Sequence, residues 1–248
     1  MSTLTQLFTS IANAIRAKKG TSALIQAEDF PTEISGIEIG ELTEQEYETA
    51  LDLSVEILGL DSAYTPVQYI ESTGTQYINL DFISGNSTNF IMKLATTNEN
   101  PTSIKRILGG YNSSNRFELA LHNSSSNGIF MNYNNGSVYS QYVPTLNTPF
   151  IVKKDGAKLI LPNGEFTLSS GEFSSEKSCY IFASNRSSTE KFIGRIYYCK
   201  IYNGTTLIRK LIPCVRQSDS EAGFYDLANS KFYTNSGTGT FIAGPSLE

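Results

Sequence analysis

From Tyr64 onward the chain consists of short apolar runs separated by residues that favour turns, and this pattern constrains the fold most. The expected strands are Phe90–Leu94, Arg106–Leu108, Phe117–Leu121, Ile129–Tyr133, Phe150–Val152, Lys158–Leu161, Cys179–Ala183, Arg195–Tyr202 and Leu207–Ile212. The expected turns are Gly109–Gly110, Asn134–Asn135–Gly136, Asp155–Gly156 and Asn163–Gly164. No helical pattern interrupts these runs. The region therefore predicts ten or more antiparallel strands, in a sandwich or jelly roll.

Two stretches predict finer features of this β region. In Arg195–Tyr202, alternation predicts Tyr197, Cys199 and Ile201 on one face, and Tyr198, Lys200 and Tyr202 on the other. Near the end of the chain, Phe224–Tyr225 and Phe232–Tyr233 flank Leu227–Ser230, which predicts a β-hairpin with a polar turn capped by Asp226. We expect Tyr69–Leu80 to pair with this hairpin, so that strands from the two ends of the β region close the sandwich.

Length and composition fit a globular protein. The chain has 248 residues, 40% of them hydrophobic and 17% charged, which is enough for one large or two modest domains. The net charge of −5, without an extended basic run, makes nucleic acid and anionic membranes poor partners. We expect no membrane insertion, because no apolar stretch approaches the length of a spanning helix. The N-terminus lacks the basic-then-apolar pattern of a signal peptide, so we expect a cytosolic origin.

Helical patterns occur only near the N-terminus. Residues 3–19 and 43–58 each begin with a capping box and carry an apolar stripe at helical spacing. We therefore expect a helical module for attachment or oligomerisation at 1–60 and a β-sandwich at 61–246. The stripes pack either within the chain or against another subunit, and both alternatives stay open here. The residues expected at an oligomer contact are Leu4, Phe8, Ile11, Ile15, Tyr47, Leu51 and Leu58.

The sequence predicts neither a cofactor nor enzymatic activity. Cys179, Cys199 and Cys214 lack metal-ligand spacing and are expected to be buried free thiols; a Cys179–Cys199 disulfide would require an oxidising compartment. The single histidine, His122, is expected in an exposed loop rather than as a catalytic base. No strand carries the alternating carboxylates that glycosidases of this architecture use, because Glu118 is alone in its strand.

Several loops combine aromatic rings with amide or guanidinium donors, as carbohydrate binding requires. An alternative explanation is that Asn and Tyr are frequent in this chain and that Asn serves the turns. The absence of Trp weakens the case for sugar stacking. The candidate carbohydrate-binding residues are Tyr111, Asn115, Arg116, Asn132, Tyr133, Asn185 and Arg186.

Four segments carry a resemblance to a known family: Tyr69–Ile78, Ile212–Cys214, Gly223–Asp226 and Phe232–Phe241. They resemble the laminin-G-like, concanavalin-A-like lectin modules of bacteriophage and prophage tail and fibre proteins, over about residues 64–244. The segment Leu7–Ile37 also resembles a small module that precedes receptor-binding or spacer domains in such proteins.

The resemblance implies a mainly β fold: a concanavalin-A-like jelly-roll sandwich of two antiparallel sheets after a small α-helical module. It implies a structural protein of the virion (tail, fibre or baseplate), assembled in the bacterial cytoplasm and presenting a lectin-like domain for host-surface glycan recognition. Other virion proteins and a host cell-surface polysaccharide would be its partners, and a homotrimer its favoured oligomer. Modules of this kind often hold calcium, although Asp81, Asp219 and Asp226 stand apart here. The alternative is a decoration or spacer protein of the virion that makes only protein contacts.

Overall fold

The computed structural model describes residues 12, 13, 15, 16, 60–98, 103–122, 128–169, 171–186 and 190–247. Contacts along the chain define two units, Met1–Gly59 and Leu60–Glu248, and each is considered by itself. In the first unit the four described residues are helical, and Ala12 and Ile15 are buried, at 6% and 4% exposure. The rest of the predicted helical module, including Leu4, Phe8, Ile11, Tyr47, Leu51 and Leu58, lies outside the described residues.

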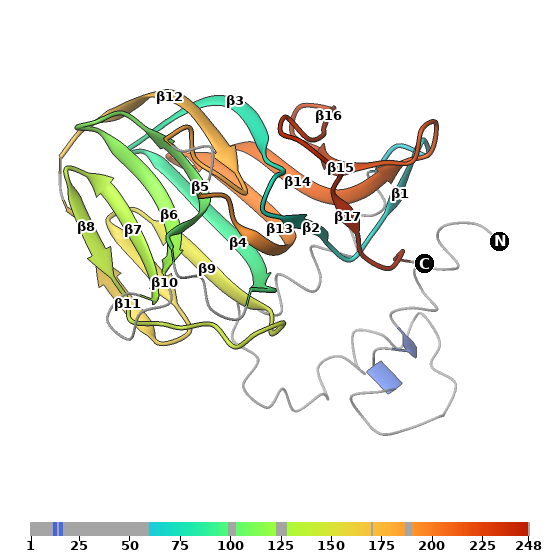
Figure 1. The fold of residues 1–248 in the computed structure, drawn as a ribbon, viewed down its shortest axis with the longest axis horizontal. Helices are drawn as coiled ribbons and strands as arrows, with labels where there is room; N and C mark the ends of the chain where they lie inside the picture. Colours follow the sequence, from blue (N-terminus) through green and yellow to red (C-terminus); the bar gives the residue numbers. More distant parts are fainter. Residues whose placement is uncertain are drawn as a thin grey trace. The chain divides into compact units, whose positions relative to one another are not determined.

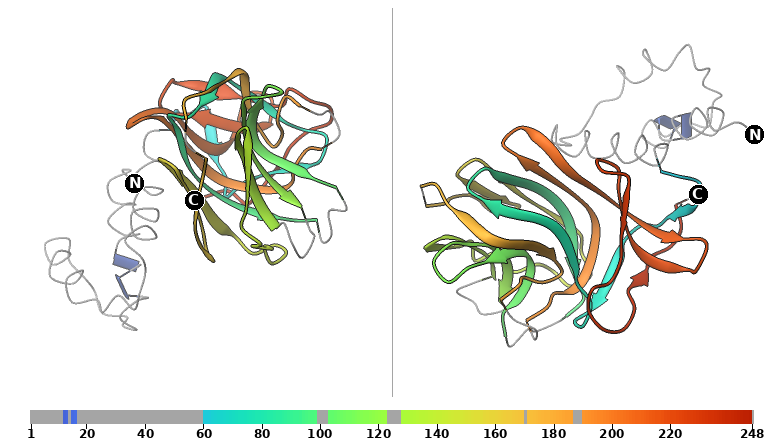
Figure 2. Two further views of the ribbon diagram at one scale, coloured as in Figure 1. Left: turned by 90° about the vertical axis from the view of Figure 1, so that its left-hand side faces the viewer. Right: turned by 90° about the horizontal axis from the view of Figure 1, so that it is seen from above.

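The second unit is mainly β and consists of two antiparallel sheets, shown in Figures 1 and 2. The smaller sheet has six strands in the order β3-β12-β5-β6-β7-β8. Its strands are β3 (Ile78–Gly85), β5 (Lys105–Tyr111), β6 (Arg116–His122), β7 (Gly128–Asn134), β8 (Gly136–Tyr139) and β12 (Ser174–Ile181).

The larger sheet has eleven strands, and its main path runs β11-β10-β9-β4-β13-β14-β15-β16. The strands on this path are β4 (Thr88–Thr96), β9 (Phe150–Asp155), β10 (Lys158–Leu161), β11 (Gly164–Thr167), β13 (Ile193–Asn203), β14 (Thr206–Arg216), β15 (Glu221–Asp226) and β16 (Lys231–Tyr233). Off this path lie β1 (Tyr64–Pro66), β2 (Ile70–Thr73) and β17 (Ile242–Ala243), of which β1 pairs with β14 and β2 joins β13 to β17. In Figure 1, β1 and β15 to β17 lie at the opposite end of the unit from β7 and β8.

One hydrophobic core joins the two sheets. Phe117, Leu119 and Leu121 on β6 enter it from the smaller sheet, and Phe90 and Met92 on β4 enter it from the larger one. All nine predicted strands lie in observed strands, although Cys179–Ala183 extends past the end of β12 at Ile181. The expectation of a two-layer antiparallel β domain is therefore confirmed.

The predicted terminal hairpin is present, but it does not close the domain as expected. β15 and β16 pair through Asp226 and Lys231, and Asp226 Oδ1 accepts the Ala228 amide at 3.0 Å, as predicted for a capped turn. The hairpin pairs with β14 rather than with Tyr69–Leu80. The two ends of the β region instead meet through β2 and β17, with Ile242 opposite Glu71.

Two further expectations are wrong. Gly109–Gly110 is not a turn: both glycines lie inside β5 because the adjacent strand approaches closely, and a Cβ on Gly109 would lie 2.4 Å from the Phe117 carbonyl oxygen. The alternation in β13 also breaks, since a bulge between Ile196 and Tyr198 moves Tyr197 out of the series of Cys199 and Ile201. The Tyr197 ring instead packs edge-to-face with the ring of Tyr69, the residue before β2, at 5.4 Å between centroids.

All three cysteines are buried and free, as predicted. Burial raises the pKa of the Cys214 thiol to about 12 and raises the pKa of Cys179 and Cys199 as well. The thiols are therefore neutral at physiological pH and act as small core side chains.

Candidate functional site

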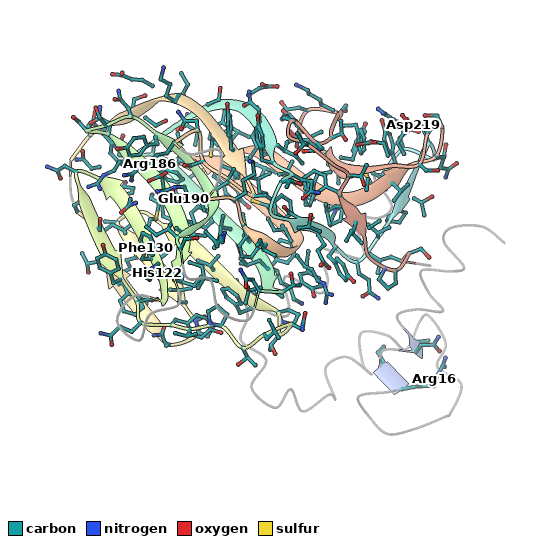
Figure 3. The ribbon with its side chains drawn as sticks, viewed as in Figure 1. Arg16, His122, Phe130, Arg186, Glu190 and Asp219 are labelled. Atoms are coloured by element: carbon teal, nitrogen blue, oxygen red, sulfur yellow. The ribbon has the colours of Figure 1, made fainter. Side chains whose placement is uncertain are left out.

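The candidate site is the outer face of the six-stranded sheet, the side of β5 to β8 that points away from the core. Side chains alternate along a strand, so with Phe117, Leu119 and Leu121 in the core, Arg116 and Glu118 point outward from β6. The strand register then defines rows across this face. Tyr111 lies opposite Arg116; Gly109, Glu118, Asn132 and Ser137 form the next row. Figure 3 shows Arg186, Glu190, Phe130 and His122 over these strands.

A loop excursion covers part of this face. The chain leaves the sheet after β12, and Phe182 adopts a φ of +65°, a left-handed conformation that is unusual for a bulky residue. Its amide donates to the Ile107 carbonyl at 2.7 Å, and the Arg106 amide donates to the Glu190 carbonyl at 2.7 Å. Both ends of the excursion are thus fastened to β5. The buried Phe182 ring, 5.1 Å from that of Phe241, anchors the strained position in the core.

Asn185 fixes the middle of the excursion to β5. Its Oδ1 accepts the Tyr111 amide at 2.5 Å, and its Nδ2 donates to the Tyr111 carbonyl at 3.0 Å. Both ends of the side-chain amide are therefore used in holding the loop, which suits Asn185 to positioning its neighbours. The Arg186 guanidinium, the next side chain, lies over the Tyr111 ring at 4.5 Å from its centroid.

Glu118 joins the excursion to three strands. Its carboxylate is fully buried and accepts the Ser184 hydroxyl at 2.6 Å and the Asn132 amide at 3.1 Å. Arg106 Nη1 lies 3.0 Å from Glu118 Oε1 as an ion pair without a well-aligned hydrogen bond, and Arg186 Nη1 lies 3.9 Å from Oε2. The Glu118 carboxylate therefore has the hydrogen bonds and the ion pair that compensate a buried charge for its loss of water.

Arg106 is the buried cation of the network. It is 1% exposed, and its Nε and Nη2 each lie 2.8 Å from Glu190 Oε2 at the end of the excursion. The Ser137 hydroxyl on β8 donates to Asn132 Oδ1 at 2.7 Å, which extends the polar chain to the edge of the sheet. The contacts therefore run from Glu190 to Ser137 across β5, β6, β7 and β8.

An exposed ring lies beside this polar chain. Tyr139 on β8 is 48% exposed, and its ring lies against Phe130 of β7 at 5.3 Å between centroids. Tyr139 and Phe130 are cross-strand partners one row beyond Asn132 and Ser137. The outer face therefore combines an accessible aromatic surface with hydroxyl and guanidinium groups.

The predicted carbohydrate-binding residues divide between the two faces of the sheet. Tyr111, Asn132, Asn185 and Arg186 come together as described. Arg116 donates to the carbonyls of Asn134 and Gly136 at 3.2 and 3.3 Å, and Asn115 lies in the β5–β6 connection.

Tyr133, however, belongs to the core. It is 3% exposed, and its hydroxyl donates to the Asn86 carbonyl at 3.0 Å. Its ring packs edge-on against Phe173 at 4.8 Å, on the opposite face from Asn132. Because neighbours in a strand point to opposite faces, Asn132 and Tyr133 cannot both contact one ligand there. His122 is the last residue of β6 and is partly buried, not in the exposed loop that we expected.

Sequence reasoning did not assign Arg106, Ser184, Glu190 or Tyr139 to the site, and it considered Glu118 only as a carboxylate without a partner in its strand. A usable signal was a charge within an apolar run: Arg106 precedes Ile107–Leu108, and Glu118 lies between Phe117 and Leu119. Opposite charges in neighbouring apolar strands indicate a buried pair. The contribution of Ser184 and Glu190 depends on the path of the excursion, which no local pattern reveals.

Among the described residues, no group of three or more His, Cys, Asp or Glu side chains could hold a metal ion. The three aspartates considered for calcium have protein partners. Asp81 pairs with Lys231 at 2.6 Å, Asp219 pairs with Arg216 at 2.7 Å, and Asp226 caps its turn. In the part of the chain that the structure describes, no helix is long and apolar enough to cross a membrane.

Comparisons with known proteins add little. No family model matches the sequence, and no curated protein matches it. Among solved structures, the chain is similar to the native heptameric SAP-like pentraxin from Limulus polyphemus, with a TM-score of 0.43 and 8% sequence identity over 75% of this chain and 97% of that chain. A similarity this low supports no conclusion about the present chain.

Proposed function

We propose that the outer face of the six-stranded sheet binds a carbohydrate without cleaving it. The observation that carries the proposal is the convergence on one face of the exposed Tyr139 ring, the Ser137 hydroxyl and the Arg186 guanidinium, of which the first two come from β8 and the third from a fastened loop. Sugars present an apolar side to rings and hydroxyls to polar groups. From β8 to β5, where Arg186 lies over Tyr111, the face measures about 14 Å, three strand spacings, which suits an oligosaccharide better than a single sugar.

The same geometry favours binding over hydrolysis. A glycosidase needs two carboxylates that reach the scissile bond from opposite sides. Here Glu118 is fully buried among donors, and Glu190 is bound to Arg106. Each hydroxyl that exchanges water for protein contributes only about 0.5–1.5 kcal/mol. We therefore expect a dissociation constant of roughly millimolar to tens of micromolar per site, made useful by several copies acting together.

In its wider role we propose a structural protein of a phage virion (tail, fibre or baseplate) that presents this lectin-like domain to a host-surface glycan. This rests on the resemblance of Tyr69–Ile78 and Phe232–Phe241 to laminin-G-like, concanavalin-A-like modules of phage proteins. We place it in a virion assembled in the bacterial cytoplasm, as a homo-oligomer, with a trimer favoured, and in contact with other virion proteins. We propose no cofactor, so a chelator should leave binding unchanged.

The test is a glycan array combined with retention on bacterial cell walls. Tyr139→Ala should weaken retention several-fold and leave the thermal midpoint nearly unchanged, because the ring is half exposed. Ile83→Ala is the matched control, since Ile83 is 58% exposed but lies on β3, at the other end of the same sheet. Equal loss in both variants, or a parent that binds no glycan, would contradict the proposal.

The alternative is a virion decoration or spacer protein that makes only protein contacts. It is favoured by two exposed apolar side chains, Tyr139 at the end of β8 and Val143 four residues further along the chain, at 48% and 45% exposure. A protein contact would need both side chains, whereas stacking on a sugar needs only the ring. Val143→Ser therefore separates the two functions: it should leave glycan retention intact and disrupt only a protein interface.

A further inference from the structure

One arginine differs from the other stacked arginines of the domain. Arg195, Arg209 and Arg216 each lie over an aromatic ring and also meet an oxygen at 2.7 Å: Glu71 Oε2, the Leu80 carbonyl and Asp219 Oδ2, respectively. Arg186 has the ring of Tyr111 but, among the described residues, no acceptor within hydrogen-bond distance of its guanidinium. Its nearest carboxylate oxygen is Glu118 Oε2, at 3.9 Å.

The Arg186 guanidinium is also held in place and accessible. Tyr111 covers one side of the guanidinium. The preceding residue, Asn185, is held to β5 by the two hydrogen bonds of its side chain with Tyr111, and the Arg186 amide donates to Ser184 Oγ at 3.3 Å. The side chain is nevertheless 41% exposed. A planar donor group that is fixed before binding loses little conformational freedom when it meets a ligand.

Glu118 does not supply the missing acceptor. Its oxygens already accept hydrogen bonds from Ser184 and Asn132 and form an ion pair with Arg106, and the carboxylate is fully buried. The other nearby acids are engaged too: Glu190 contacts Arg106, and Glu176 accepts the Asn112 amide at 2.7 Å. Among the described residues, Arg116, opposite Tyr111 on β6, bonds only the neutral carbonyls of Asn134 and Gly136 and has no carboxylate partner, so a second guanidinium lies close by.

We propose that Arg186 binds an anionic substituent, a carboxylate or a phosphate, of the carbohydrate on this face. The inference rests on the proposed glycan-binding function and narrows its ligand to acidic polysaccharides. A guanidinium donates two parallel hydrogen bonds to either anion, and such charge-assisted pairs are about twice as strong as neutral ones. Arg116, in the adjacent strand, adds a favourable positive potential.

The experiment measures binding of the full chain to two pairs of polymers that differ only in charge. Polygalacturonate is compared with its methyl ester, and phosphorylated dextran with plain dextran, so the two arms separate carboxylate from phosphate recognition. We expect at least one acidic polymer to bind about tenfold or more tightly than its neutral counterpart, with binding that weakens as salt is raised.

Variants assign the effect to a residue. Arg186→Ala should remove the preference for the acidic form, and Arg186→Lys should restore it only in part, because an ammonium lacks the planar pair of donors. Arg216→Ala, which removes a stacked arginine at the other end of the domain near Asp219 (Figure 3), should change nothing. Equal binding of charged and neutral forms, or an unchanged preference in Arg186→Ala, overturns this inference and leaves glycan binding standing. Failure to bind any carbohydrate overturns both proposals.

Discussion

Glu118 is the residue on which the outer face depends, because it links β5, β7 and the loop excursion through one buried carboxylate. Glu118→Gln keeps the size of the side chain and some of its hydrogen bonds, but it removes the negative charge, so that Glu190 is the one carboxylate of the described residues left to pair with Arg106. Breaking a buried ion pair costs about 3–5 kcal/mol, so we expect a loss of roughly 3 kcal/mol in the free energy of unfolding. Chemical denaturation measures it. Lys158→Ala, at the exposed Lys158–Glu165 pair, is the control and should change stability little. Equal effects would show that the Glu118 network contributes no more than a surface pair.

Lys154 is another buried charged residue, at 0% exposure, and its environment predicts a dependence of stability on pH. Its ammonium group donates to the carbonyls of Asn86 and Gly156 and to Asn89 Oδ1, all neutral oxygens. Desolvation lowers the pKa of Lys154 from 10.5 to about 8 in the folded protein, against an opposing effect of Asp155. Between pH 8 and 10.5 the unfolded chain then binds more protons, so this group makes the folded state more stable as pH rises.

The measurement compares the parent with Lys154→Met. From pH 8 to 10.5, the stability of the parent relative to the variant should increase by on the order of 3 kcal/mol. The buried thiols act in the opposite direction, because their raised pKa favours the unfolded state in alkaline solution, but they are common to both proteins and cancel in the difference. A difference that stays flat with pH would mean that Lys154 is not desolvated in the folded state.

The sequence predicted single residues only where local chemistry determines their role. Asp226 was identified correctly because its turn lies within three residues of it, and the cysteines because apolar neighbours indicate burial. Tyr133 was misassigned because an aromatic residue beside Asn132 and Asn134 resembles a loop, whereas the register of β7 with β6 turns it into the core. Register is a property of two strands, so composition around one of them does not reveal it.

Elements were predicted well and their irregularities poorly. Each expected strand is present because alternation and turn residues report on the local chain. The bulge in β13 and the excursion that starts at Phe182 depend on neighbours distant in sequence, such as Leu94 on β4 and Ile107 on β5. The sequence therefore predicted Arg186 as a binding residue but not its position over Tyr111, which depends on the path of the excursion.

Gly109 tests how closely β5 and β6 approach each other. A Cβ there would lie 2.4 Å from the Phe117 carbonyl oxygen and 2.8 Å from the Glu118 Cα, both backbone atoms that cannot move independently. Gly109→Ala should therefore destabilise the domain by about 1–3 kcal/mol and displace Glu118. Gly136→Ala is the control, because its nearest neighbour would be 3.4 Å away. Thermal unfolding of both variants decides the point, and equal midpoints would contradict the close packing of these strands.

For the whole molecule, the fold class followed from the sequence because patterning is distributed over every strand. The closure did not follow, since β17 is only two residues long and carries little signal of its own. Around it, loop contacts replace strand pairing: the Ser236 amide donates to the Tyr77 carbonyl at 2.8 Å, and Gln76 Nε2 donates to the Thr240 carbonyl at 2.9 Å. The motifs behind the family resemblance thus meet in space through turns rather than through a long ladder.

The last prediction concerns the division of the chain at Gly59. Among the described residues, the hydrophobic core cluster lies entirely between Val67 and Phe241, so we expect residues 60–248 to fold alone and give a cooperative β-type circular dichroism spectrum. We expect self-association to run through the N-terminal stripes, although Ile15 is already buried within one chain, which favours intramolecular packing for that residue. Light scattering on the full and shortened chains measures the difference. The shortened chain should be monomeric if the N-terminal stripes hold the oligomer together, and an unchanged oligomer would assign assembly to the β domain instead.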